Sequence, residues 1–177
     1  MSEYSDRLLV DGPRKDRVSK VKPAVAILVP LAAILFQVYV PLFFKYLSYL
    51  ELPLLVTVYF SLVRRHQIAG TLIGAVIGLA QDSLAHHPLG MYGIVKTLVG
   101  YFSASISLRL DIENSMLRLF VGFFFFLFHE SFFWLLSGAL LGQDQSFDLI
   151  RTLMAAVLNA AVAVPLFAIL DKLKERP

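Results

Sequence analysis

The sequence predicts an all-α integral membrane protein with six transmembrane helices. Of its 177 residues, 58% are apolar and only 16% are charged, and the mean hydropathy is +0.71. A soluble globular domain is usually about 45–50% apolar. Six apolar runs, most of them close to the ~20 residues that cross a ~30 Å hydrocarbon core, explain the excess. We expect them to span the membrane at residues 24–44, 52–63, 68–85, 91–108, 116–141 and 149–170.

The first run is too long for a signal-peptide core of ~7–15 residues, so we expect a retained first helix. The chain then divides into a basic tail, one six-helix membrane domain and a second tail, at residues 1–23, 24–170 and 171–177. Basic residues gather on the side of the two tails, and the exceptions are Lys45, Lys96 and Arg151. By the positive-inside rule, both termini are expected in the cytoplasm. The basic tail would lie near anionic lipid.

The second run, residues 52–63, is short for a membrane span. Pro53 would stand at or near its first helical position, where the missing N–H is harmless. A re-entrant segment would return Arg64 and Arg65 to the outer face, against the charge bias. We therefore expect a short complete span, preceded at residues 45–51 by an external loop or an interfacial extension.

The third run carries glycines at four-residue spacing, Gly70, Gly74 and Gly78. Because a helix has 3.6 residues per turn, these glycines share one face. Such a stripe lets another helix approach closely. The other helix could belong to this chain, to a separate subunit or to a second copy, and the sequence leaves these alternatives open.

Two charged residues interrupt the third and fourth runs near their outer ends. Asp82 continues the glycine stripe, and Lys96 lies five residues inside the fourth run. The short connection between the runs predicts antiparallel neighbours, so the two side chains could form an ion pair that fixes the register of the hairpin. Alternatively, Lys96 extends to the membrane surface, or the two form a polar site for a ligand or partner.

Three further polar residues are expected near the middle of the membrane. His129 and Glu130 lie in the fifth run and Asn159 in the sixth, at similar distances from the outer ends. They predict a structural hydrogen-bond layer in which Glu130 contacts Asn159 or His129. The alternative is a site that handles a proton or a ligand. Pro165 is expected to kink the last helix.

These residues do not form a recognisable catalytic or metal-binding set. His129 and Glu130 are not followed by a second histidine at HExxH spacing, and there is no cysteine. Only one aspartate lies in a run, which excludes a paired-aspartate protease. His86 and His87 stand beside Pro88 in an expected external turn, which is more typical of an exposed turn than of a metal site. We therefore expect no enzyme, metal or cofactor, and no binding of nucleic acid, because the basic residues follow membrane topology.

A glycine-spaced helix ending in GLxxD, a PLG turn and a helix with a GY pair follow one another in residues 70–101. The motif residues are Gly78, Leu79 and Asp82, then Pro88, Leu89 and Gly90, then Gly100 and Tyr101. In order and spacing, this segment resembles the rod shape-determining protein MreD family. The resemblance extends to the length, the six spans and the proline-opened second span. It also includes Asn159 followed by Pro165 in the last span.

The resemblance implies a non-catalytic scaffold subunit of the bacterial elongation complex, located in the cytoplasmic (inner) membrane. Such a subunit would bind the bitopic protein MreC. It would work with MreB and with the peptidoglycan glycosyltransferase and transpeptidase pair in lateral wall synthesis and cell shape. The family is also similar in fold to the substrate-binding components of energy-coupling-factor transporters. The alternative function is therefore a small-molecule-binding component, with a mostly apolar outer pocket lined by Gln37, Asp82, Tyr92, Lys96 and Trp134.

Overall fold

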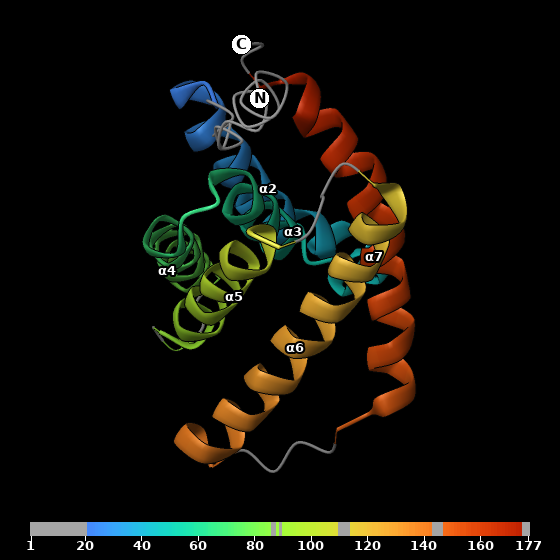
Figure 1. Cartoon of the computed structure of the whole chain (residues 1–177). Coiled ribbons are helices and arrows are strands. Elements are labelled where there is room, and N and C mark those ends of the chain that lie inside the picture. The colour runs from blue at the N-terminus through green and yellow to red at the C-terminus, as the bar shows by residue number, and fades with distance from the viewer. Residues whose placement is uncertain (1–20, 86–87, 89, 110–113, 143–146, 175–177) are drawn as a thin grey trace, which may run out of the picture.

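The computed structural model describes residues 21–85, 88, 90–109, 114–142 and 147–174, and the long elements of this part of the chain are all helices. Its six α-helices are α2 (Pro23–Phe43), α3 (Leu52–Arg64), α4 (Gln67–Leu84), α5 (Met91–Ser107), α6 (Ser115–Leu141) and α7 (Leu149–Lys172). A short 3-10 helix, η1 (Lys45–Tyr49), precedes α3. The predicted all-α class is confirmed, and each α-helix occupies one of the six apolar runs (Figure 1).

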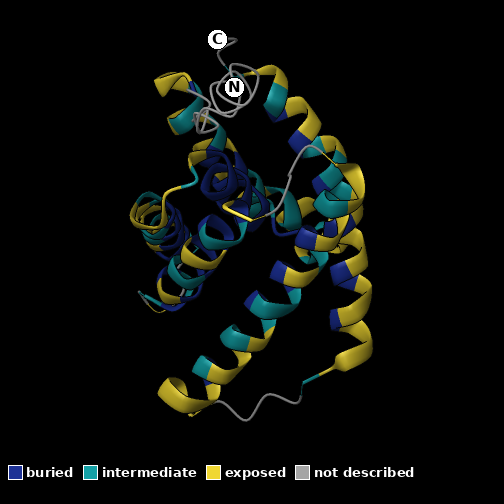
Figure 2. Cartoon of the chain, in the orientation of Figure 1, coloured by how far each residue is buried: buried dark blue, intermediate teal, exposed yellow. Residues whose placement is uncertain are grey.

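Helix α3 lies at the centre of the fold and contacts all five other α-helices. Every residue from Pro53 through Val63 is buried, and Figure 2 shows the helix as the most continuously buried element. Pro53 stands in its first turn, where proline is tolerated. The 13 residues of α3 are short for a span, but η1 and α3 together form a 20-residue apolar segment, Lys45–Arg64. Of the segment expected as an external loop or an interfacial extension, Lys45–Tyr49 form η1, whereas Leu50 and Glu51 are buried in the bundle.

Helices α4 and α5 form a tightly packed hairpin (Figure 1). A Cβ atom added at Gly70, Gly74 or Gly78 would overlap a backbone carbonyl oxygen of α5. The oxygens belong to Gly100, Lys96 and Tyr92 respectively. The glycine stripe is therefore occupied by the chain's own neighbouring helix, as in small-residue packing of membrane helices.

Helices α6 and α7 form a second hairpin on the other side of the molecule. The two helices approach closely at Gly122, where an added Cβ would meet the Cβ of Ala163 at 2.7 Å. Figure 1 shows the loop-connected ends of this hairpin extending beyond the start of α5. Exposed apolar side chains such as Leu135, Leu140 and Ile150 cover these ends.

The two ends of the described chain meet on one side of the bundle. Val21 and Lys174 form an isolated antiparallel bridge, the only extended pairing in the described part of the chain. Next to it, Asp171 pairs with Arg118 of α6 and with Lys174, and accepts a hydrogen bond of 3.1 Å from the Tyr59 hydroxyl of α3. This cluster joins α3, α6 and α7. The cytoplasmic placement of this end stays a prediction.

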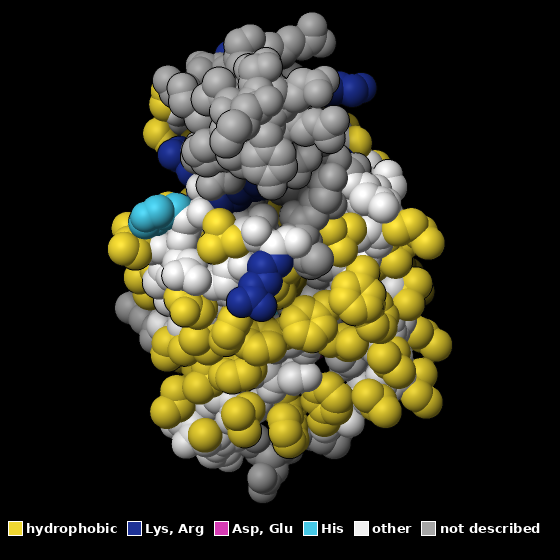
Figure 3. Space-filling model, viewed as in Figure 1, with side chains coloured by type: hydrophobic (Ala, Val, Ile, Leu, Met, Phe, Trp, Pro, Cys, Tyr) yellow, Lys and Arg dark blue, Asp and Glu magenta, His cyan; other side chains and the backbone are white. Residues whose placement is uncertain are grey.

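The outer surface is suited to a bilayer. Hydrophobic side chains gather over the lower part of the face shown in Figure 3, whereas the Lys and Arg side chains visible there lie in its middle and upper parts. Within the described residues, four segments are long and apolar enough to cross a membrane: Pro23–Phe43, Lys45–Arg64, Ser115–Leu141 and Leu149–Lys172. The chain thus has the character of an integral membrane protein. Crossing by α4 and α5, and so the full count of six spans, stays a prediction.

Candidate functional site: a polar core between two helical hairpins

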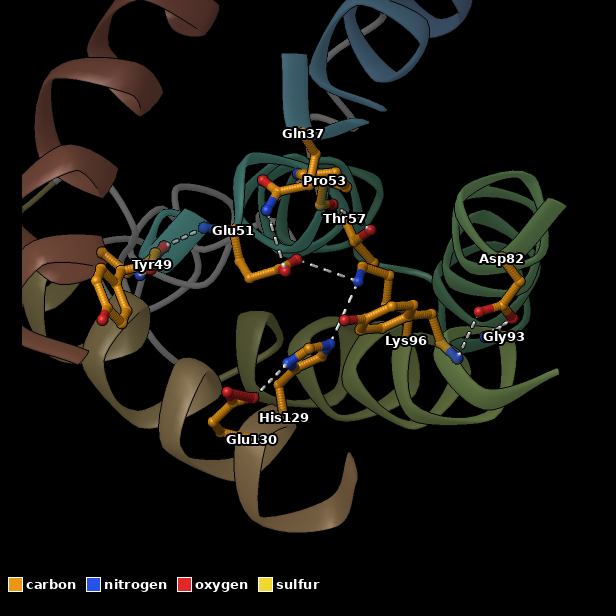
Figure 4. Close-up of polar contacts among 12 residues, drawn as sticks. Gln37, Tyr49, Glu51, Pro53, Thr57, Asp82, Gly93, Lys96, His129 and Glu130 are labelled. Carbon is orange, nitrogen blue, oxygen red and sulfur yellow. Dashed lines mark hydrogen bonds and ion pairs between the residues drawn. The ribbon is translucent and has the colours of Figure 1, made fainter. Parts of the chain in front are cut away.

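The Asp82 carboxylate binds the N-terminus of α5. Its two oxygens accept hydrogen bonds from the backbone N–H groups of Gly90, Tyr92 and Gly93 at 2.9, 3.1 and 3.1 Å. These are donors that a helix start leaves without intrahelical partners, and a negative charge there is favourable. Asp82 thus caps the neighbouring helix. The expected ion pair with Lys96 is wrong, because the carboxylate is directed at backbone groups (Figure 4).

The turn that presents these N–H groups depends on Gly90. Its φ of +101° lies in the left-handed region, which a residue with a side chain seldom adopts. Pro88 is exposed at the surface of the same turn, and Leu89 lies outside the described residues. The GLxxD and PLG motifs therefore have one joint role, because the second motif shapes the turn that the carboxylate of the first motif holds.

Lys96 is completely buried between the two hairpins. Its Nζ lies 3.5 Å from Glu51 Oε2 at the start of α3 and 3.2 Å from His129 Nε2 of α6. The same nitrogen lies 4.3 Å from the centre of the Tyr92 ring. Lys96 does not extend to the surface, so that alternative is wrong. Instead, this side chain connects α3, α5 and α6, and Figure 4 shows Glu51 and His129 on either side of it.

The Asn159 side chain holds the junction between η1 and α3. Its Oδ1 accepts the backbone N–H of Glu51 at 2.9 Å, and its Nδ2 donates to the carbonyl oxygens of Tyr49 and Ala155 at 2.7 and 2.9 Å. The predicted layer of three residues is thus divided. Asn159 binds backbone groups, whereas His129 Nδ1 lies 3.9 Å from Glu130 Oε2.

Glu130 faces a cavity of about 280 Å³ between η1, α5, α6 and α7. We call this cavity the polar chamber. Its lining residues are Ser48, Tyr49, Glu51, Tyr92, Phe126, Glu130, Phe133, Trp134, Phe147, Asp148, Arg151, Thr152 and Ala155. Of the predicted pocket residues, Tyr92 and Trp134 line the chamber, whereas Gln37, Asp82 and Lys96 do not. Gln37 instead donates a hydrogen bond of 3.4 Å to Glu51 Oε1.

Sequence reasoning missed two residues of this region. Glu51, the counter-charge of Lys96, was assigned to the expected external loop or interfacial extension before the second span. Arg151 was considered only for topology, yet its guanidinium carbon lies 4.8 Å from the centre of the Tyr49 ring. The available signal for Glu51 was its position directly before a proline-opened span. An acidic residue that is buried there needs a partner of opposite charge.

The remaining motif residues are also structural in this arrangement. An added Cβ at Gly100 would overlap the Gly70 carbonyl oxygen, so the GY pair completes the close approach of α4 and α5. Tyr101 is 42% exposed and packs edge-on against Phe102. The glycine stripe faces α5 and therefore cannot also receive a partner helix or a second copy while the hairpin is intact.

In the part of the chain that the structure describes, no three His, Cys, Asp or Glu residues gather as metal ligands. His86 and His87 lie outside the described residues. The carboxylates Asp82 and Glu51 and the amide of Asn159 all bind other parts of the chain, so their chemistry positions helices. The geometry defines a helical membrane protein whose buried charges hold its hairpins together.

Comparison with known families then gives a specific assignment. The profile described as rod shape-determining protein MreD matches residues 19–176. The chain belongs to this family, which confirms the resemblance of its sequence, and it is a membrane component of rod-shape determination. No curated protein and no solved structure gives a significant match.

Proposed function

We propose that the protein is a non-catalytic scaffold subunit of the bacterial elongation complex, which binds MreC and organises lateral peptidoglycan synthesis. MreB and the glycosyltransferase and transpeptidase pair would be the further partners. The observation that supports this proposal is the distribution of polar groups. Asp82, Lys96 and Asn159 bind elements of the same chain, whereas the faces turned outward are mostly apolar.

A groove between α2 and α4 is the best candidate surface for MreC. It has a volume of about 420 Å³, and Phe60 of α3 contributes to its lining. Arg64 is the single charged residue among its lining residues, and the others are apolar. Val76, which is 67% exposed, lies on its α4 wall. A bitopic partner offers one apolar helix, and such a helix associates in lipid through close packing.

The test is co-purification of MreC with the tagged full-length chain in a mild detergent. We expect MreC to be recovered with the unaltered protein and with Leu135→Trp, a control on the exposed face of α6. Val76→Trp should fill the groove and reduce recovery, while the protein is still inserted in normal amount. No MreC with the unaltered chain would contradict the scaffold function. Full recovery with Val76→Trp would contradict only the choice of groove.

The polar chamber supports a second candidate, a small-molecule-binding component of an energy-coupling-factor-type transporter. The chamber is concave, and its lining combines aromatic side chains with charged and hydroxyl groups that could orient a ligand, so it is more polar than the pocket that the sequence predicts. A ligand at 100 times its dissociation constant should stabilise the folded protein by about 2.7 kcal/mol. A thermal-unfolding screen of vitamins and wall precursors tests this candidate, and the absence of any shift would exclude it for those compounds.

A further inference from the structure

We propose that the polar chamber and an apolar groove beside it together bind one zwitterionic phospholipid of the ethanolamine type. The phosphate would contact Arg151, the ammonium group would point toward Glu130, and an acyl chain would follow α7. This proposal does not depend on the scaffold function, because it concerns the opposite side of the bundle from the α2–α4 groove.

The chamber exists because α3 is short. At 1.5 Å per residue, its 13 residues span about 20 Å, well below the ~30 Å of a hydrocarbon core. The start of α3 is fixed by Asn159, which is ten residues into α7 and therefore about 15 Å from its beginning. Between the start of α3 and the loop-connected ends of α6 and α7, the bundle has no central helix. The outer halves of α6 and α7 enclose the remaining space with η1 and the start of α5.

Charges of both signs line the chamber. Arg151 is the one basic residue among its lining residues, and its side chain is exposed over the Tyr49 ring. Of the three acidic lining residues, Glu51 pairs with Lys96, and Asp148 caps α7 by accepting the Arg151 backbone N–H at 3.1 Å. Glu130 keeps 42% of its side chain exposed. Arg151 and two exposed carboxylates, Glu130 and the helix-capping Asp148, thus face the same space.

A second cavity adjoins the chamber on the outside of α7. It has a volume of about 420 Å³, and we call it the outer groove. Tyr49, Asp148, Arg151 and Ala155 line both cavities. The outer groove adds the exposed apolar side chains of Ile150, Met154 and Leu158. The polar and apolar cavities therefore meet at these four residues, which include Arg151.

This arrangement matches an amphiphile with a dipolar headgroup. A guanidinium forms strong paired hydrogen bonds to phosphate. An ammonium group is favoured by a carboxylate, which Glu130 supplies in the chamber. An anionic lipid has no ammonium group, so it would place a negative or neutral group beside the carboxylates of the chamber. A soluble headgroup alone would leave the outer groove unused.

The test is native mass spectrometry of the purified full-length protein with added lipids. We expect a 1:1 adduct with phosphatidylethanolamine that forms about tenfold more tightly than the adduct with phosphatidylglycerol, since one charged hydrogen bond accounts for such a ratio. Glycerophosphoethanolamine, the headgroup without chains, should bind much more weakly. Equal binding of phosphatidylglycerol, or equal binding of the soluble headgroup, would overturn the proposal.

Matched variants locate the site. Arg151→Gln should lower phosphatidylethanolamine binding about tenfold, whereas Lys45→Gln, at an exposed position of η1, should not change it. Met154→Trp should obstruct the outer groove, and Ile169→Trp is its control, because Ile169 lies eleven residues beyond Leu158, toward the other end of α7. Both positions are more than half exposed, so these variants should fold normally. Binding that is unchanged by Arg151→Gln and by Met154→Trp would overturn the assigned site.

Discussion

Removing the Asp82 carboxylate should destabilise the protein by about 3 kcal/mol. In Asp82→Ala, the backbone N–H groups of Gly90, Tyr92 and Gly93 lose their acceptor. The Gly93 contact is buried, and an unsatisfied buried donor costs about 1–3 kcal/mol. The other two contacts are partly buried near the helix start, where water can replace the carboxylate, so each should add about 0.5 kcal/mol.

The assay is reversible unfolding in mixed micelles, followed by the fluorescence of Trp134, the single tryptophan. Asn114→Ala is the control, because Asn114 caps α6 through one exposed hydrogen bond of 2.9 Å to the Met116 N–H. An exposed cap contributes about 1 kcal/mol. Asp82→Asn keeps the shape but not the charge and should fall between the two. If Asp82→Ala and Asn114→Ala were equally destabilising, the assignment of Asp82 as a buried helix cap would be refuted.

Three further variants test the packing and the polar core. Gly74→Leu should prevent folding of the hairpin, because its side chain would meet the α5 backbone, while Gly138→Leu, at a position with open space, should leave protein levels in the membrane unchanged. Lys96→Met should lower the free energy of unfolding by about 3–5 kcal/mol, and Glu51→Gln should lower it by less. In a double-mutant cycle, the double variant should be less destabilised than the sum of the two single variants, and strict additivity would contradict the ion pair. Asn159→Ala should cost about 2 kcal/mol in the same unfolding assay, and an unchanged midpoint would contradict its role at the η1–α3 junction.

Local patterns were sufficient to place the helices. Long apolar runs are specified by residues close in sequence, so their positions can be read without knowing the tertiary structure. The third run was expected to start at residue 68, and α4 starts one residue earlier, at Gln67. Pro53 likewise marked the beginning of α3. The glycine spacing correctly indicated a close helix contact on that face of α4. Spacing alone does not tell whether the approaching backbone belongs to the same chain, and here Gly74 faces the carbonyl of Lys96.

The partners of the buried charges were harder to predict, because they depend on tertiary geometry. Lys96 and Asp82 are near each other along adjacent helices, which suggested a pair. The Asp82 carboxylate instead binds three backbone donors at the start of α5, and Lys96 pairs with Glu51, which lies 45 positions earlier. That contact requires the segment before α3 to turn inward, and Asn159 secures this turn from the far end of the chain. No local pattern encodes such a contact.

The closely packed α4–α5 hairpin has a consequence for biogenesis. Within the described residues, neither α4 nor α5 is among the segments that are long and apolar enough to cross a membrane alone. When unpaired, Asp82 and Lys96 each oppose the insertion of their helix by up to about 2.5–3.5 kcal/mol, which is the cost of a charge at the centre of a span. Synthesis order favours their neutralisation, because Glu51 emerges from the ribosome before Lys96, and Asp82 emerges just before the N–H groups that it binds. We therefore expect α4 and α5 to enter the bilayer together, as one folded hairpin guided by the segment made before it.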